Sequence, residues 1–175
     1  GAHGLADVPL RFDERITASE VRLVGVPGAV LAASASSEEY RRHLQAAALP
    51  LLILISSGAP RIVLRGLVLR GAVAVDGSEL HVANCTFEGG SADLGGALAV
   101  SGGAAVVRAS AFHDCSARRG GALHVSHGAA TFHDCIFEAC TASEEGGALW
   151  VGVAGRVELG SGTLLRGDTA AGADE

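Results

Sequence analysis

Two copies of the tetrapeptide Phe-His-Asp-Cys, at 112–115 and 132–135, carry side chains that can bind a metal ion. Histidine nitrogen and cysteine sulfur are the ligands that zinc prefers, and a structural zinc site needs four of them to converge. The two copies start 20 residues apart. A shared zinc site therefore requires elements that bring positions 20 residues apart together.

The elements that hold these residues repeat with a different period. The tetrapeptide Gly-Gly-Ala-Leu occurs at 95–98, 120–123 and 146–149, and Phe87, Phe112 and Phe137 stand 25 residues apart. Two markers in phase indicate one supersecondary unit repeated. A period near 25, many glycines and few aromatic residues are typical of a parallel β-helix, in which each coil consists of short strands joined by bends. We therefore predict an all-β fold, a right-handed parallel β-helix with one short inserted helix.

Residues one period apart should lie directly above one another, because successive coils of such a fold stack about 4.8 Å apart. Apolar residues alternate with variable ones along each repeat, as expected of strands with one face in a core. The predicted inward columns are Ile62-Leu80-Ala105-Ala130-Val157, Leu64-Val82-Val107-Phe132-Leu159, Leu67-Cys85-Ser110-Cys135-Gly162 and Leu69-Phe87-Phe112-Phe137-Leu164.

This period separates the two candidate metal tetrapeptides, since 20 residues place them at different positions of the coil. We therefore expect no metal site. Cys115 and Cys140 fall one coil apart in one column, within reach of a disulfide, whereas Cys85 and Cys135 lie two coils apart and too far to bond. We favour free cysteines that pack as small apolar side chains. A Cys115–Cys140 disulfide is the alternative and would indicate an oxidising compartment.

Charged residues form two outward columns in this register. The first column pairs opposite charges on neighbouring strands, which stabilises a sheet modestly, and so does a second one in the loop before each Gly-Gly-Ala-Leu. We interpret both as structural, since surface ion pairs contribute little individually. The first predicted charge ladder is Arg70, Glu88, His113 and Glu138, and the second is Asp93, Arg118 and Glu144.

The only tryptophan, Trp150, shares a predicted outward column with Ala99 and His124. An outward tryptophan is either covered by a terminal segment or forms a contact point for a partner or a sugar. A second partner contact is predicted on the inserted helix. There, Ser36 starts a capping pattern and an apolar stripe includes Tyr40 and Leu44.

The 175 residues are expected to form one domain. We divide it into an N-terminal cap or first coil at 1–20, the inserted helix at 36–49, regular coils at 51–165 and an acidic tail at 166–175. No apolar run is long enough for a transmembrane segment. A net charge of −6 without a basic stripe argues against nucleic acid as a partner.

The Gly-Gly-Ala-aliphatic segments, alternating with strands such as Asn-Cys-Thr-Phe-Glu-Gly-Gly at 84–90, resemble the repeats of polymorphic outer membrane proteins and related pectin-lyase-like β-helix proteins. The resemblance covers roughly residues 62–165. It departs from the family where asparagine is expected, since Gly90, Cys115 and Cys140 occupy those positions. The family implies surface display, adhesion or scaffolding.

Enzymes among β-helix proteins of this kind use clustered carboxylates with calcium, or paired aspartates with a Gly-His-Gly segment. The nearest approach is Ser126-His127-Gly128, without an aspartate pair. We therefore expect no catalytic residues and no cofactor, and predict a structural or protein-docking module, an accessory subunit or scaffold part of a larger assembly. A carbohydrate-binding or adhesive surface module is the alternative, and a polysaccharide lyase or hydrolase the second alternative. A chain that begins Gly1-Ala2-His3 suggests processing, which favours an organelle such as a plastid, or the cell surface, over the cytosol.

Overall fold

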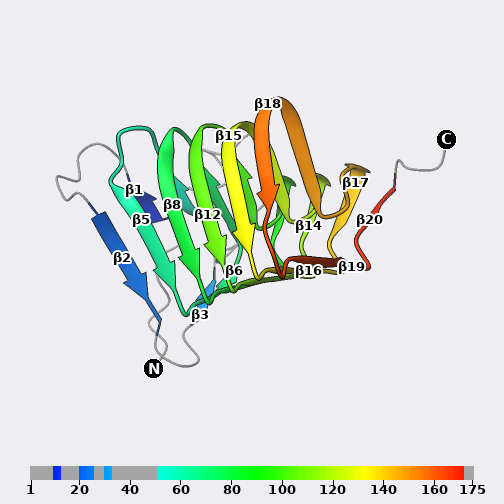
Figure 1. Cartoon of the computed structure of the whole chain (residues 1–175), viewed down its shortest axis with the longest axis horizontal. Helices are drawn as coiled ribbons and strands as arrows, with labels where there is room; N and C mark the ends of the chain where they lie inside the picture. Colours follow the sequence, from blue (N-terminus) through cyan, green and yellow to red (C-terminus); the bar gives the residue numbers. More distant parts are fainter. Residues whose placement is uncertain (1–9, 13–19, 26–29, 33–50, 172–175) are drawn as a thin grey trace, which may run out of the picture.

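The computed structural model describes residues 10–12, 20–25, 30–32 and 51–171. Within these ranges the regular structure consists of β-strands, and every strand pair is parallel. Strands about 25 residues apart lie side by side, so the chain winds into a parallel β-solenoid, as predicted (Figure 1). No helix in this part of the chain is long and apolar enough to cross a membrane.

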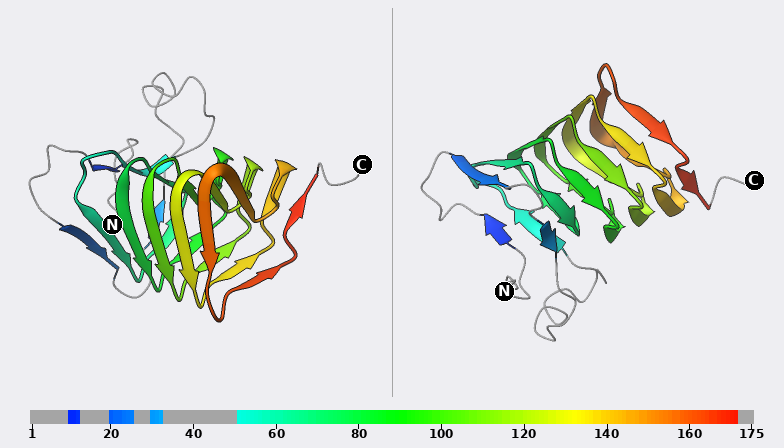
Figure 2. Two further views of the ribbon diagram at one scale, coloured as in Figure 1. Left: turned by 45° about the horizontal axis from the view of Figure 1, so that its top comes forward. Right: turned by 90° about the horizontal axis from the view of Figure 1, so that it is seen from below.

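Three parallel sheets form the walls of the solenoid, which Figure 2 shows from two further directions. The largest sheet bends, because the long strands β15 and β18 pair along both of its limbs. It contains β1 (Leu10–Phe12), β4 (Leu51–Ile55), β7 (Ala72–Val75), β11 (Leu98–Val100), β15 (Leu123–His133), β12 (Gly103–Arg108), β8 (Ser78–Ala83), β5 (Arg61–Arg65), β2 (Glu20–Val24) and β18 (Leu149–Leu159).

Two smaller sheets complete the walls. The six-stranded sheet contains β3 (Val30–Ala32), β6 (Val68–Arg70), β9 (Thr86–Glu88), β13 (Ala111–His113), β16 (Ile136–Glu138) and β19 (Leu164–Arg166). The four-stranded sheet contains β10 (Ser91–Leu94), β14 (Ser116–Arg119), β17 (Thr141–Glu145) and β20 (Thr169–Ala170).

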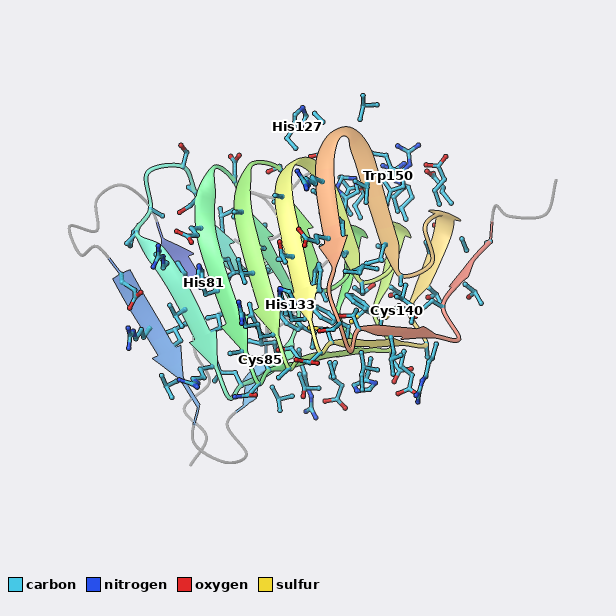
Figure 3. All side chains as sticks on the ribbon, in the orientation of Figure 1. His81, Cys85, His127, His133, Cys140 and Trp150 are labelled. Carbon is cyan, nitrogen blue, oxygen red and sulfur yellow. The ribbon has the colours of Figure 1, made fainter. Side chains whose placement is uncertain are left out.

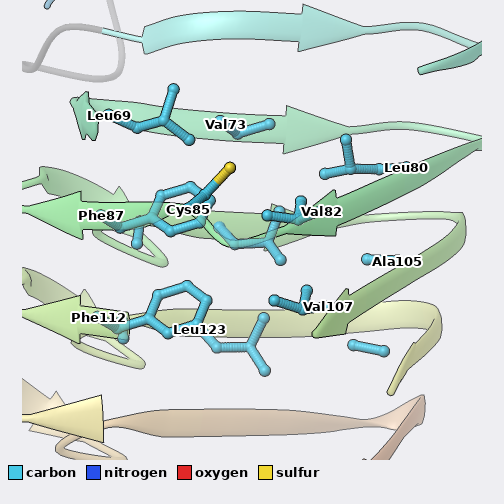
Figure 4. Packing of buried hydrophobic residues seen from close by; sticks show 14 of the residues in the cluster. Leu69, Val73, Leu80, Val82, Cys85, Phe87, Ala105, Val107, Phe112 and Leu123 are labelled. Atoms are coloured by element: carbon cyan, nitrogen blue, oxygen red, sulfur yellow. The ribbon is translucent and has the colours of Figure 1, made fainter. Parts of the chain in front are cut away.

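The core is a set of stacked columns inside these walls (Figure 4). The two columns that begin at Ile62 and Leu64 have the predicted register through to β18. Phe112 is fully buried between Phe87 and Phe137, with ring centroids 4.7 and 4.5 Å away and nearly parallel planes. Apolar burial therefore runs continuously along the solenoid axis, and each coil is held chiefly by its two neighbours.

The Gly-Gly-Ala-Leu repeat marks the bend between the four-stranded sheet and the largest sheet. Its first glycine has a left-handed backbone, with φ of 63° at Gly120, where a side chain would be strained. The second glycine touches the next coil: a Cβ on Gly121 would overlap the carbonyl oxygen of Gly147 and lie 2.6 Å from the amide nitrogen of Thr141. The tetrapeptide therefore recurs because this bend must be both left-handed and closely packed.

The last coil departs from the predicted columns by one residue. Phe137 pairs with Leu165 and not with the predicted Leu164, which pairs with Ile136. Thr163, not Gly162, reaches the cysteine column, where its hydroxyl lies 3.5 Å from the amide of Cys135. The physical reason is a loop one residue longer, because six positions separate Leu159 from Leu165 where five separate Phe132 from Phe137.

Regular pairing also continues past the predicted end of the coils at residue 165. Strand β20 pairs Thr169 with Thr141 and Ala170 with Ala142, inside the stretch interpreted as an acidic tail. The predicted helix at 36–49 lies outside the described residues, as does most of the predicted cap at 1–20.

Candidate functional site

The first charge ladder lies on the outside of the six-stranded sheet in the predicted order. Arg70 donates to Glu88 at 3.0 Å, and His113 lies 3.1 Å from Glu138. The register continues the column to Arg166, which is paired with Glu138 across the strands. These side chains are about half exposed, so their contribution to stability is small.

The second charge ladder lies on the four-stranded sheet and is more tightly connected. The Arg118 guanidinium donates to Asp93 at 2.9 Å in the preceding coil and to Glu144 at 2.9 Å in the following one. This hydrogen-bonded arginine holds the pKa of the Asp93 carboxyl below its ordinary value. Arg119 adds a further contact to Glu144 at 3.1 Å.

An aromatic stack lies beside this ladder, on the outer face of the largest sheet. The rings of His124 and Trp150 are parallel, with centroids 4.4 Å apart. The Arg119 guanidinium lies 5.8 Å from the Trp150 ring centroid, and the indole N–H donates to Glu145 at 2.8 Å. The predicted column Ala99-His124-Trp150 is thus confirmed by strand register, and its last member lies on β18 (Figure 3).

The imidazole of His124 is nearly fully covered although it points away from the core. Burial lowers its pKa below the ordinary value of 6.5, and the nearby positive charges of Arg119 and Arg118 lower it further. The neutral ring is therefore the form that stacks on Trp150 at neutral pH. Trp150 has its other face toward the C-terminal end of the solenoid, since His124 occupies the coil before it.

The four cysteines line two corners of the solenoid and all are buried and free. Cys115 and Cys140 occupy neighbouring coils, and the Cys140 thiol contacts the carbonyl oxygen of Phe112 at 3.6 Å. The adjacent Cys115 thiol and burial both raise the pKa of the Cys140 thiol. The two Phe-His-Asp-Cys tetrapeptides lie at different corners, and no three metal-binding side chains converge among the described residues.

The C-terminal coil, formed by β18, β19 and β20, ends the solenoid with its interior uncovered within the described part of the chain (Figure 1). Five of the six large apolar side chains with substantial exposure belong to it: Val151, Val153, Leu159, Leu164 and Leu165. Leu159 and Leu165 are 44 and 45% exposed, whereas Phe132 and Phe137, directly beneath them, are fully buried. We call this apolar surface the open end.

The open end contains a hollow of about 420 Å³, lined by Leu149, Leu165 and Asp168 among others. One carboxylate oxygen of Asp168 accepts the amide N–H of Cys140 at 2.8 Å, and the other is buried without a hydrogen-bond partner. A buried oxygen of this kind is costly unless a donor reaches it. Sequence analysis missed Asp168, although it lies three positions after Leu165, as Cys140 does after Phe137.

The predicted partner contacts therefore separate into two groups. Trp150 and His124 form one stacked site beside the open end, whereas Tyr40 and Leu44 lie outside the described residues. In comparisons with known proteins, no protein family, no curated protein and no solved structure matches this chain.

Proposed function

We propose that this chain is a non-catalytic β-solenoid docking module, an accessory or scaffold part of a larger assembly, and that the open end is its docking surface. The observation that carries the proposal is the exposure of Leu159 and Leu165 in columns that every described earlier coil buries. An exposed apolar patch beside unpaired strand edges is typical of an interaction site. The occupant would supply strands for these edges and apolar side chains for the hollow.

The chemistry around the open end supports a protein occupant. Strands β18 and β19 present backbone groups along one edge, which a partner strand can pair with. The orphaned oxygen of Asp168 requires a hydrogen-bond donor. The resemblance of the repeats to pectin-lyase-like β-helix proteins with scaffolding or adhesive roles fits the same proposal, including a right-handed coil.

Site-specific photocrosslinking in an extract of the source tests this function. A photoreactive phenylalanine derivative replaces Leu165 at the open end in one variant and Arg108, an exposed residue of β12 in mid-solenoid, in the control. We expect one defined protein adduct from position 165 and none from position 108. Unlabelled wild-type chain should compete for the adduct, and a Leu159→Glu chain should compete poorly. Adducts that form equally from both positions, or none from position 165, would refute the proposal.

A second candidate function, carbohydrate binding, is favoured by the stack of Trp150 on His124. Aromatic rings commonly contact the apolar faces of ligands while nearby polar groups orient them. Arg119 and Glu145 are such polar groups here. Binding to a glycan array that is lost in Trp150→Ala and retained in Trp150→Phe would support it. Equal binding by wild type and Trp150→Ala would exclude this site.

A further inference from the structure

We infer that the occupant of the open end is a second copy of this chain, which stacks its N-terminal coil on the C-terminal coil of its neighbour, head to tail. This inference rests on the proposed docking function and names its partner. It is carried by the residues at the two ends of the strand register, which fit one another when the columns are continued from one copy into the next.

The two end strands of one limb of the largest sheet are β2 and β18. Strand β2 pairs with β5, and no described strand pairs with its other edge. Strand β18 pairs with β15 and is likewise an edge among the described strands. In one continuous register through β5, β8, β12 and β15, each residue of β2 shares a column with one residue of β18. The pairs are Glu20 with Arg156, Val21 with Val157, Arg22 with Glu158 and Leu23 with Leu159.

These four pairs are complementary throughout. Both charged pairs join opposite charges, and both apolar pairs fall in inward columns. Arg22, Arg156, Glu158 and Leu159 are exposed in the single chain. Opposite charges on neighbouring strands attract, and like charges directly opposite repel. Stacking β2 of one copy on β18 of another would therefore continue the sheet without one like-charge contact.

The other two strands of the first coil fit their counterparts as well. The column of Leu165 begins at Leu31, and that of Leu164 at Val30, so β3 offers apolar residues to β19. The column of Trp150 begins at Arg11 on β1. An arginine above the free face of an indole is a favourable cation–π arrangement.

Head-to-tail stacking differs from a tail-to-tail dimer in two ways that can be measured. It joins unlike surfaces, so each added copy leaves a new free end and the assembly grows as an open filament. A tail-to-tail dimer would close at two copies and would not use β2. The same tail residues behave differently in the two cases, because Arg156 and Glu158 can face each other across an antiparallel β18 pair even after they are exchanged.

Charge exchange at each end of the full-length chain tests the inference. The tail variant carries Arg156→Glu and Glu158→Arg, and the head variant carries Glu20→Arg and Arg22→Glu, so both keep the net charge of −6. Sedimentation measures the mass distribution against concentration. Fluorescence of Trp150, the only tryptophan, reports whether its free face is covered. Far-ultraviolet circular dichroism checks that each variant is folded.

We expect the wild-type mass to rise with concentration beyond a dimer, and each variant alone to associate about tenfold more weakly or less. Mixing the two variants should restore assembly, since each tail then meets a head of opposite charge. A tail variant that still dimerises, or a mixture that stays monomeric, would overturn the inference. A wild-type chain that remains monomeric while position 165 crosslinks to another polypeptide would also overturn it, and would leave the docking function standing.

Discussion

Replacing Phe112 by alanine is the sharpest test of the stacked core. The ring is fully buried, lies parallel to Phe87 and Phe137 at 4.7 and 4.5 Å, and meets the edge of Phe132 at 5.9 Å. Truncating a buried phenylalanine costs about 3 to 5 kcal/mol. Because two parallel stacks are lost together, we expect the upper part of this range, about 4 to 5 kcal/mol.

Two matched variants show whether the cost comes from position in the stack. Phe112→Leu keeps an aliphatic side chain like that of Leu69 and Leu165 in the same column, and should lose only about 1.5 kcal/mol. Leu165→Ala alters the same column at the open end, where 45% of the residue is already exposed. It should lose about 1 to 2 kcal/mol, less than a fully buried leucine would.

Urea denaturation followed by circular dichroism measures these differences as changes in the free energy of unfolding. It is done at a protein concentration low enough to suppress association. The order of cost should be Phe112→Ala first, with the other two variants well below it. A Phe112→Ala cost under about 2 kcal/mol, or one equal to that of Leu165→Ala, would refute the view that burial is continuous along the column and ends at the last coil.

Three further predictions concern the bends, the second charge ladder and the thiols. Gly121→Ala should destabilise the fold by about 3 kcal/mol or more because its Cβ meets backbone of the next coil. Gly89→Ala, where φ is also positive but nothing lies within 4 Å, should cost only about 1 kcal/mol in the same denaturation assay. The pKa of Asp93 is depressed in the folded state, so its pairing with Arg118 stabilises the fold above the ordinary value of 3.8 and is lost as pH falls through the lower folded value. The stability difference between wild type and Arg118→Gln should therefore shrink on acidification below pH 4, and a pH-independent difference would contradict this. All four thiols are buried, so iodoacetamide at pH 8 should label them slowly in the folded chain and fully in urea. A non-reduced mass lower by two hydrogens would instead reveal a disulfide.

The repeat in the sequence was sufficient to predict the strand register over most of the chain. The glycine tetrapeptides and the phenylalanines fix the same phase independently, and the columns from Ile62 to Val157 and from Leu64 to Leu159 follow from that phase alone. This works because a solenoid stacks like on like, so that one period determines every neighbour.

The prediction lost register where the markers end. No phenylalanine and no further tetrapeptide follow Leu149, so nothing in the sequence revealed the extra residue between Leu159 and Leu165. The role of Asp168 was missed for the same reason, since its column had been followed only to Cys140. The stack of His124 on Trp150 was half predicted: register gave the column, but the burial of His124 depends on side chains from neighbouring strands.

The residues that the periodicity specifies least are those at the ends, and the ends determine what a solenoid can join. A coil inside the array is stabilised by two neighbours, whereas the described C-terminal coil has one, so its interior is only half covered. Whatever stacks on Leu159 and Leu165 completes that coil and binds to it through the same contacts. Association and folding of this coil are therefore linked, and the midpoint of thermal unfolding should rise with protein concentration if the occupant is a second copy.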